Sequence, residues 1–155
     1  MLQAASETKG GETTGGAEGG QLTAVMAGQT IVGTSYASPL VEVFGDVCIG
    51  KQSFVASNTV LRAAPDQRLD IGNETNAQDN VIVRSLVDSS RIGDETSLAH
   101  HAIVRYSTIG NFAFVGLDAG IIDSNVKDGA LISAGAVIEN VTIPEDALVP
   151  PGAEI

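Results

Sequence analysis

Large aromatic side chains are scarce in this sequence. No tryptophan occurs among its 155 residues, and aromatic residues make up 4% of them, although 43% of the residues are hydrophobic. A core without large rings must be filled by Val, Ile, Leu and Ala, which favours a narrow, regular interior over an irregular globule. The length suits one domain with a core of its own.

Basic residues are also few. Lys and Arg number 8 against 19 Asp and Glu, which gives a formal net charge of -11. Because affinity for nucleic acid comes largely from Lys and Arg on phosphates, nucleic acid is a poor partner for this chain. An anionic membrane surface is disfavoured for the same reason. We expect the excess of carboxylates to form a solvated acidic surface.

The single cysteine, Cys48, excludes an intrachain disulfide. It lies in the segment FGDVCIG, and its apolar neighbours predict a buried, unreactive thiol. Long apolar runs are absent, and the first residues, MLQAASETKGG, lack the basic start and apolar stretch of a secretory signal. We therefore expect no membrane insertion and a cytoplasmic location.

Residues 1–22 have the composition of an unstructured segment. Gly, Glu, Thr and Ser dominate MLQAASETKGGETTGGAEGGQL, and no apolar periodicity is present. Such a segment buries too little apolar surface to offset the entropy lost on ordering. We predict a flexible arm over 1–22 and one domain over 23–155.

The second half of the chain contains a repeat with steps of six, six and five residues. Its twelve aliphatic positions are Ile92, Leu98, Val104, Ile109, Val115, Ile121, Val126, Ile132, Ile138, Ile143, Val149 and Ile155. The 17-residue cycle matches neither a helix nor an ordinary strand. It predicts an all-β solenoid whose coils have three flat faces, stacked about 4.8 Å apart as parallel strands. We expect seven coils or fewer, with these twelve side chains pointing inward.

The repeat continues upstream with longer third corners. Ile49, Val55 and Leu61 are six apart, as are Ile71, Ala77 and Val83, but the third corners are five and four residues longer than downstream. The inserted segments APDQR and LVDSSR should bulge outward along one edge. Phe44 is expected to end a further coil. Glycine follows the inward residue at four corners, which suggests that a tight turn requires it: Gly50, Gly72, Gly93 and Gly110.

The register also aligns polar residues. Arg62, Arg84 and Arg105 each follow the inward residue of the third face, so they should stack in one column. Like charges this close need counter-charges or a bound anion. The candidate carboxylates are Asp79, Asp66, Asp70 and Glu74.

Both histidines lie near the second corner. Asp79 and His100 occupy equivalent positions and should be stacked neighbours one coil apart. His101 would point to the opposite face of an extended strand. The two histidines of one chain should therefore not hold the same metal ion.

Four segments carry a family resemblance: TVLRAA (59–64), TNAQDNVIVRS (75–85), SLAHHAIVRYS (97–107) and VTIPEDALVPPGAEI (141–155). Together they resemble the γ-class carbonic anhydrases of the hexapeptide-repeat family, over roughly residues 39–155. The resemblance implies a left-handed parallel β-helix and a homotrimer with its sites between subunits. Each site in the family holds zinc through three histidines, one of them from the neighbouring chain. The C-terminal helix usual in the family has no clear counterpart here.

The zinc positions of the family are altered in this chain. They fall on Arg84, His100 and Arg105, with His100 as the neighbour's contribution. A guanidinium is permanently protonated and has no lone pair for a metal, so we expect no zinc and no other cofactor. The vestigial ligand position His100, together with Arg84 and Arg105, forms a candidate site for a small bicarbonate-like anion.

Other family positions are kept. Arg62, Asn76 and Gln78 match the pattern, and the resemblance implies an interface salt bridge between Arg62 and Asp79. The family's Arg-x-Asp reads Arg62-Ala63-Ala64, so its acidic member is missing.

These observations favour a trimeric γ-carbonic-anhydrase-like protein without carbonic anhydrase activity, acting as a scaffold or assembly subunit or as an anion-binding homologue. A hetero-trimer with a complete γ-carbonic anhydrase subunit, or a larger complex, is a second possibility. There His100 would complete a partner's zinc site and support interconversion of CO2 and bicarbonate. A rearranged metal site is a further route to that activity, and a hexapeptide acyltransferase using His100 as base is the remaining alternative.

Overall fold

The computed structural model describes residues 30–31 and 34–155, so the predicted arm over 1–22 lies outside the described residues. All regular elements in this part of the chain are short strands. It contains no helix, and hence none long and apolar enough to cross a membrane.

The strands form three parallel sheets. The first contains β1 (Thr30–Ile31), β4 (Asp46–Ile49), β7 (Arg68–Ile71), β10 (Ser90–Ile92), β13 (Thr108–Ile109), β16 (Asn125–Val126) and β19 (Thr142–Ile143). The second contains β2 (Tyr36–Ala37), β5 (Phe54–Val55), β8 (Asn76–Ala77), β11 (Ser97–Leu98), β14 (Phe114–Val115), β17 (Leu131–Ile132) and β20 (Leu148–Val149). The third contains β3 (Glu42–Phe44), β6 (Val60–Ala63), β9 (Ile82–Ser85), β12 (Ile103–Arg105), β15 (Gly120–Ile122) and β18 (Val137–Glu139).

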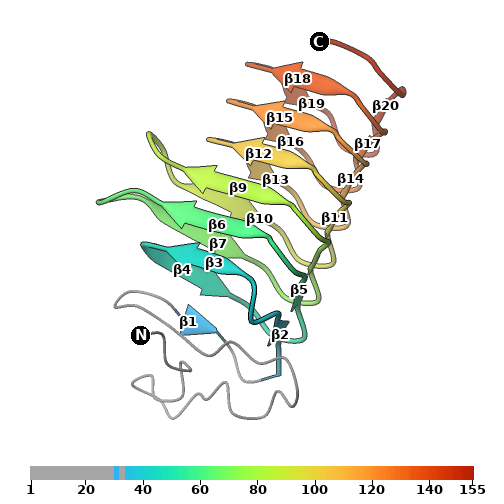
Figure 1. The fold of residues 1–155 in the computed structure, drawn as a ribbon. Coiled ribbons are helices and arrows are strands. Elements are labelled where there is room, and N and C mark those ends of the chain that lie inside the picture. The colour runs from blue at the N-terminus through green and yellow to red at the C-terminus, as the bar shows by residue number, and fades with distance from the viewer. Residues whose placement is uncertain (1–29, 32–33) are drawn as a thin grey trace.

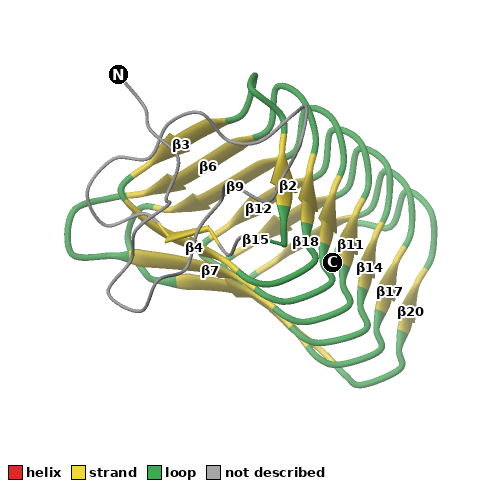
Figure 2. Cartoon of the chain, turned by 90° about the horizontal axis from the view of Figure 1, so that it is seen from below, coloured by secondary structure: helices red, strands yellow, loops and turns green. Residues whose placement is uncertain are grey.

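Each strand pairs with the strand three places further along the chain, so one coil contributes one strand to every sheet. The coils stack into a three-sided prism (Figures 1 and 2). The predicted left-handed parallel β-helix is confirmed. The smallest sheet has six strands, so the described chain completes six coils, within the expected limit.

The core is a set of vertical aliphatic columns. Parallel pairing places Ile92 beside Ile109, Leu98 beside Val115 and Val104 beside Ile121. Eleven of the twelve predicted inward residues are at most 5% exposed. The prediction was wrong for Ile155, the last residue of the sequence, which is 53% exposed.

The first described coil has a different register from the predicted one. Val43, not Phe44, is its inward residue on the third face, where it stacks below Leu61. Phe44 points outward and is 44% exposed. Ile49 follows Val43 by a step of six, one more than the step of five at the third corners after Ile92. Gly45, in the left-handed region at φ +80°, accommodates the additional residue.

The predicted bulges are present, and they are partly strand. The inserted residues lengthen the strands on both sides of the third corner, pairing Ala63 with Ser85 and Leu69 with Ser90. Figure 1 shows the β6–β7 and β9–β10 corners projecting beyond the edge of the prism. Ala63 and Leu69 are buried and belong to the main hydrophobic core, which therefore continues into this edge extension (residues 63–69 and 85–90).

The four corner glycines are required by the spacing of the coils. None of them has a positive φ, so backbone conformation is not the reason for glycine. A Cβ on Gly93 would lie 2.5 Å from the carbonyl carbon of Gly110, and one on Gly72 would lie 2.6 Å from that of Gly93. Contacts this short are forbidden, so the close approach of successive coils selects glycine.

A side-chain ladder follows this column. The backbone N–H of Asn73 donates to Asp94 Oδ1 at 2.7 Å, that of Asp94 to Asn111 Oδ1 at 2.9 Å, and that of Asn111 to Asp128 Oδ1 at 2.8 Å. Each Asn or Asp thus satisfies a corner N–H on the coil below it, which the parallel sheets leave unpaired.

We predict that Gly93→Ala lowers the free energy of unfolding by about 1–3 kcal/mol or more, because the backbone of the next coil must move. Gly120→Ala is the matched control, since its Cβ would lie 3.8 Å from Val137 with φ outside the left-handed region. That change should be neutral or stabilising by up to ~1 kcal/mol. Denaturant unfolding measures both, and equal effects would contradict the spacing argument.

Candidate functional site

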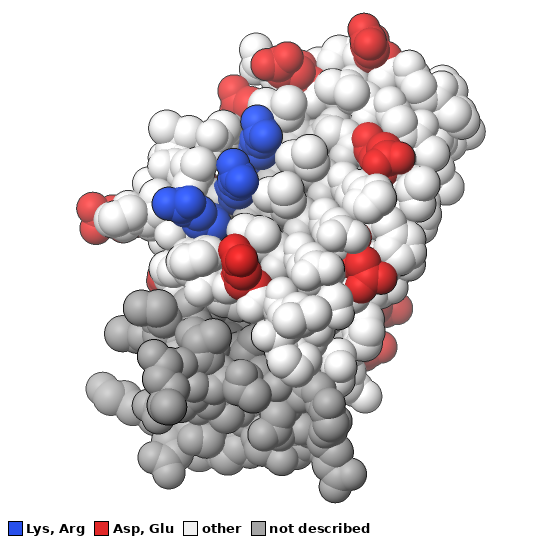
Figure 3. Space-filling model, viewed as in Figure 1, with Lys and Arg blue, Asp and Glu red and all other residues white. Residues whose placement is uncertain are grey.

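Three arginines form a column on the outer face of the third sheet. Strand pairing sets Arg62 beside Arg84 and Arg84 beside Arg105, on β6, β9 and β12. The residue before each arginine is fully buried, so the alternation of the strand turns the arginines outward. In Figure 3 the Lys and Arg side chains of this face gather in one column. The predicted stacking is confirmed.

Among the described residues the column has no acidic partner. The ion pairs of the described residues involve Arg68, His100 and His101, and none involves the three column arginines. Two unit charges about 5 Å apart repel by roughly 3 kcal/mol at an effective dielectric near 20. The column therefore carries unbalanced positive charge in an otherwise acidic protein.

The candidate carboxylates are not paired with the column. Asp70 accepts a hydrogen bond from Arg68 Nε at 2.8 Å. Asp79 accepts one from the backbone N–H of Ser57 at 3.1 Å. Arg62 lies over the ring of Phe44, with its guanidinium carbon 5.7 Å from the centroid. The predicted Arg62–Asp79 salt bridge is absent among the ion pairs of the described residues, and across a subunit interface it stays a prediction.

Arg84 and Arg105 each have an unsatisfied donor. The Nε atoms of both side chains are buried and have no hydrogen-bond partner. Leaving a buried polar group unpaired costs about 1–3 kcal/mol, and more when the group is charged. These two donors are therefore exceptions to the rule that buried polar groups are hydrogen-bonded.

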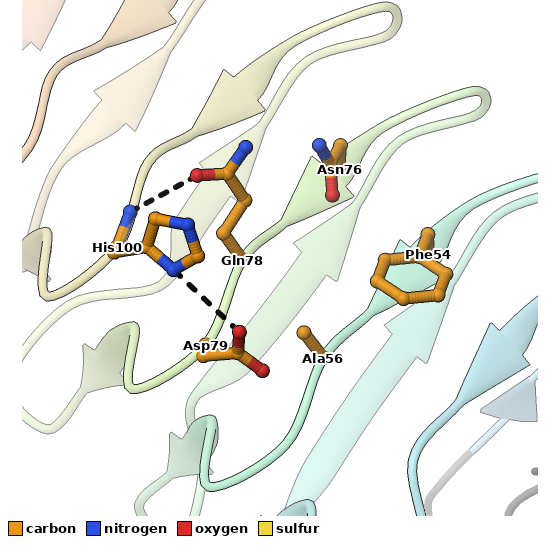
Figure 4. A pocket seen from close by; sticks show the side chains of 6 residues that line it. All are labelled: Phe54, Ala56, Asn76, Gln78, Asp79 and His100. Atoms are coloured by element: carbon orange, nitrogen blue, oxygen red, sulfur yellow. Dashed lines mark hydrogen bonds and ion pairs between the residues drawn. The ribbon is translucent and has the colours of Figure 1, made fainter.

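His100 lies in a separate hollow, shown in Figure 4. The hollow is lined by Phe54, Ala56, Asn76, Gln78, Asp79 and His100. Its residues come from successive coils: strand β5 with the turn after it, strand β8 with the turn after it, and the turn after β11. Neither Arg84 nor Arg105 is among them. A single chain therefore does not bring the three predicted anion-site residues together.

The polar groups of the hollow are partly satisfied. The backbone N–H of His100 donates to Gln78 Oε1 at 3.2 Å. His100 Nδ1 lies 3.6 Å from Asp79 Oδ2, which confirms that these residues are stacked neighbours. Asn76 Oδ1 is buried and accepts no hydrogen bond. Beside the apolar surfaces of Phe54 and Ala56, the hollow thus offers a free acceptor and a half-exposed imidazole.

His101 does not belong to this hollow. It lies in a turn at φ +62°, not in the extended strand that we expected. Its Nδ1 is 3.2 Å from Asp118 Oδ1 on the following coil, whereas His100 faces Asp79 on the preceding one. Asn58 and Asn80 occupy the same left-handed corner, a conformation that Asn, Asp and His tolerate better than most residues.

The aromatic wall of the hollow was not predicted. The rings of Tyr36 and Phe54 stack with centroids 5.1 Å apart and planes 7° apart, on the outer faces of β2 and β5. The signal was an aromatic residue at equivalent positions of two coils. Recognising this pair required the correct register of the first coil, and the prediction had placed that coil's inward residue at Phe44 instead of Val43.

The zinc ion implied by the resemblance does not fit the residues present. The described part of the chain holds no group of three His, Cys, Asp or Glu residues able to bind a metal. Arg84 and Arg105 cannot donate a lone pair, and their charge repels a cation. Another chain would have to supply any complete ligand set that uses His100.

Cys48 differs from its prediction. It is partly exposed on the outer face of β4, between the buried Val47 and Ile49. Partial burial raises the pKa of the Cys48 thiol, the charge of Arg68 acts against that rise, and Asp70 and Asp46 add to it. The thiol is thus mostly protonated near neutral pH, but it is not enclosed in the core.

Comparison with known proteins identifies the class of the fold. No protein-family model matches the sequence. It is 33% identical over 118 residues to γ-carbonic anhydrase 2, mitochondrial, of Arabidopsis thaliana, covering 70% of this chain and 42% of that protein. It is 28% identical over 134 residues to the carboxysome assembly protein CcmM of Nostoc sp., covering 79% of this chain and 24% of that protein.

Among solved structures, a hexapeptide transferase family protein from Anaplasma phagocytophilum is 28% identical, with 81% of this chain and 68% of that chain covered and a TM-score of 0.44. The chain spans less than half the length of either curated relative. It is a γ-class carbonic-anhydrase-like protein with a hexapeptide-repeat β-helix.

We predict that Cys48 reacts slowly with a thiol reagent such as DTNB at pH 7 and faster as the pH rises through its elevated pKa, because the thiolate is the nucleophile. Arg68→Gln removes a charge that lowers this pKa and should slow the reaction at fixed pH, whereas Asp70→Asn should accelerate it. Rates normalised to the unfolded chain provide the measurement. A faster reaction in Arg68→Gln, or a slower one in Asp70→Asn, would contradict the assignment.

Proposed function

We propose that this chain is a trimeric γ-carbonic-anhydrase-like subunit that acts as a scaffold or assembly component and does not hydrate CO2 by itself. The observation that carries the proposal is the pair Arg84 and Arg105, which stand in register at two positions where the resemblance places zinc ligands. Without a metal to lower the pKa of a bound water, no hydroxide forms near neutral pH to attack CO2.

The unpaired column supports assembly. Arg62, Arg84 and Arg105 lack acidic partners in the part of the chain that the structure describes, and two of them bury an unsatisfied Nε. A second subunit would bring the residues of its His100 hollow, with Asp79, against this face. Three copies related by a closed rotation would satisfy every such face without an open-ended assembly.

The relatives favour such a role. One is a carbonic anhydrase by name and another a carboxysome assembly protein, and both contain segments beyond the part that this chain matches. A mixed trimer extends the proposal: this chain would contribute His100 to the zinc site of a complete neighbouring subunit. Such a trimer would retain carbonic anhydrase activity at the neighbour's sites.

The His100 hollow favours a second candidate, a hexapeptide acyltransferase. Asp79 lies 3.6 Å from His100 Nδ1 and could orient the imidazole as a general base beside an apolar wall. Release of free thiol from acetyl-CoA with a range of hydroxyl and amine acceptors tests this. Turnover that disappears in His100→Ala would favour the enzyme over the scaffold.

We predict that the chain expressed alone and supplied with zinc binds far less than one zinc per subunit and shows no CO2 hydration above background. Arg84→His together with Arg105→His should restore zinc binding if the subunits assemble as proposed. Arg91→His, on the first sheet, is the matched control and should not. Metal analysis and stopped-flow CO2 hydration decide; near-stoichiometric zinc with turnover in the unaltered chain would overturn the proposal.

The proposed interface pair gives a further prediction. Asp79→Ala should weaken the trimer, because an interface charge left without its partner costs about 3–5 kcal/mol when buried. Asp118→Ala, which removes the carboxylate beside the exposed His101, is the control and should leave assembly unchanged. Light scattering across a dilution series measures assembly. Since Asp79 also accepts a backbone hydrogen bond, the exchange Arg62→Asp with Asp79→Arg is the second variant and should restore the trimer. An Asp79→Ala protein that stays trimeric on dilution, or an exchange variant that does not assemble, would exclude the pair.

A further inference from the structure

Positive charge is concentrated on one face of this protein, where no carboxylate of the described residues pairs with it. Three of the eight Lys and Arg residues of a chain with net charge -11 stand on adjacent strands of one sheet. The other two arginines differ: Arg68 pairs with Asp46 and Asp70, and Arg91 lies exposed on the first sheet. Arg91 also has no ion pair among the described residues, so the column is distinguished by three unpaired arginines standing on adjacent strands.

The three column arginines are not equivalent. Arg62 is exposed and its guanidinium lies over the ring of Phe44. Arg84 and Arg105 are half-buried, and each keeps an Nε donor that is buried and unpaired. The unsatisfied donors thus belong to two directly paired strand positions, with Cα partners Arg84 and Arg105.

Two guanidiniums at this spacing match one oxygen-rich anion. Each presents Nε and an Nη in the fixed fork that binds two oxygens, and an anion between neighbouring strands could accept from both forks. Such a ligand would cancel the mutual repulsion of the two charges, and it would satisfy both orphan donors once the side chains turn their buried Nε atoms toward it. A metal cation would do neither.

The surroundings limit the size of the ligand. Above Arg105 the column continues with Ile122 and then Glu139, and below Arg62 it continues with Phe44. On the same strands the neighbouring outward column is Glu42, Val60, Ile82, Ile103 and Gly120. The positive surface is thus short, flanked by apolar side chains and by the carboxylates of Glu42 and Glu139 beyond its ends, which suits a small anion and not a nucleic acid or an acidic polypeptide.

We infer that Arg84 and Arg105 form a binding site for a small oxyanion on the outer face of β9 and β12, at the place where related proteins would hold a metal. In the assembled protein, His100 of a neighbouring copy would close the site, and in this respect the inference rests on the proposed function. The two-arginine site itself belongs to one chain.

The test uses inorganic phosphate as the probe, with sulfate and bicarbonate in parallel and chloride at equal ionic strength to separate binding from screening. Calorimetry and thermal unfolding are measured on the full chain, on Arg84→Gln with Arg105→Gln, and on Arg91→Gln as the matched control. Phosphate should stabilise the unaltered chain and Arg91→Gln beyond chloride, and the double variant should bind it at least about tenfold more weakly.

A second variant keeps the test decisive if the Gln pair destabilises the fold. Arg84→Lys with Arg105→Lys retains both charges but removes the forks, so its affinity should fall between the other two. Equal phosphate binding by the Lys variant, or an oxyanion effect no larger than that of chloride, would overturn the inference.

Light scattering on the same samples separates this inference from the proposed function. A monomer that binds phosphate through Arg84 and Arg105 would support the anion site and refute the trimer. A trimer that shows no oxyanion effect would refute the site and leave the proposed assembly standing. In a trimer that binds, His100→Ala should weaken binding by a smaller factor than the arginine variants.

Discussion

The stacking of one coil directly on the next governs this molecule. Parallel pairing sets each residue beside its equivalent one coil away, about 4.8 Å distant, so any side-chain property is repeated along a column. A suitable residue is therefore reinforced by its neighbours, as in the aliphatic columns that contain Ile92 and Leu98. A charged residue can instead be placed beside one of the same charge, as in the column that contains Arg84 and Arg105. The core and the candidate site are two results of the same geometry.

This geometry explains why the coil architecture could be predicted from the sequence. From Ile92 onward the steps of six, six and five are unbroken, and one registered residue fixes all the others. The column of Arg62, Arg84 and Arg105 followed from that register without further information. The prediction failed where the step changed. The inward residues Val43 and Ile49 are six apart, whereas counting back five from Ile49 leads to Phe44.

The details of the site depend on atoms that spacing does not specify. That the Nε atoms of Arg84 and Arg105 are buried and unpaired depends on side-chain conformation and on the carboxylates near them. The orientation of His101 follows from a left-handed corner that an alternating-strand argument cannot represent. Cys48 points outward because it alternates with the buried Val47 and Ile49 along β4. The prediction of a buried thiol relied on these apolar neighbours and not on the alternation. The association of subunits involves surfaces of more than one chain, so a single register does not determine it.

The ladder of Asn73, Asp94, Asn111 and Asp128 alternates a neutral amide with a carboxylate. Successive carboxylates in it are consequently two coils apart, about 10 Å, which is close to the Debye length at ordinary salt. Copying one coil of this region would set two like residues side by side, and for an acidic coil the two charges would be in contact. The pair of coils, not the single coil, is thus the smallest unit by which this stretch could be lengthened through gene duplication without electrostatic cost.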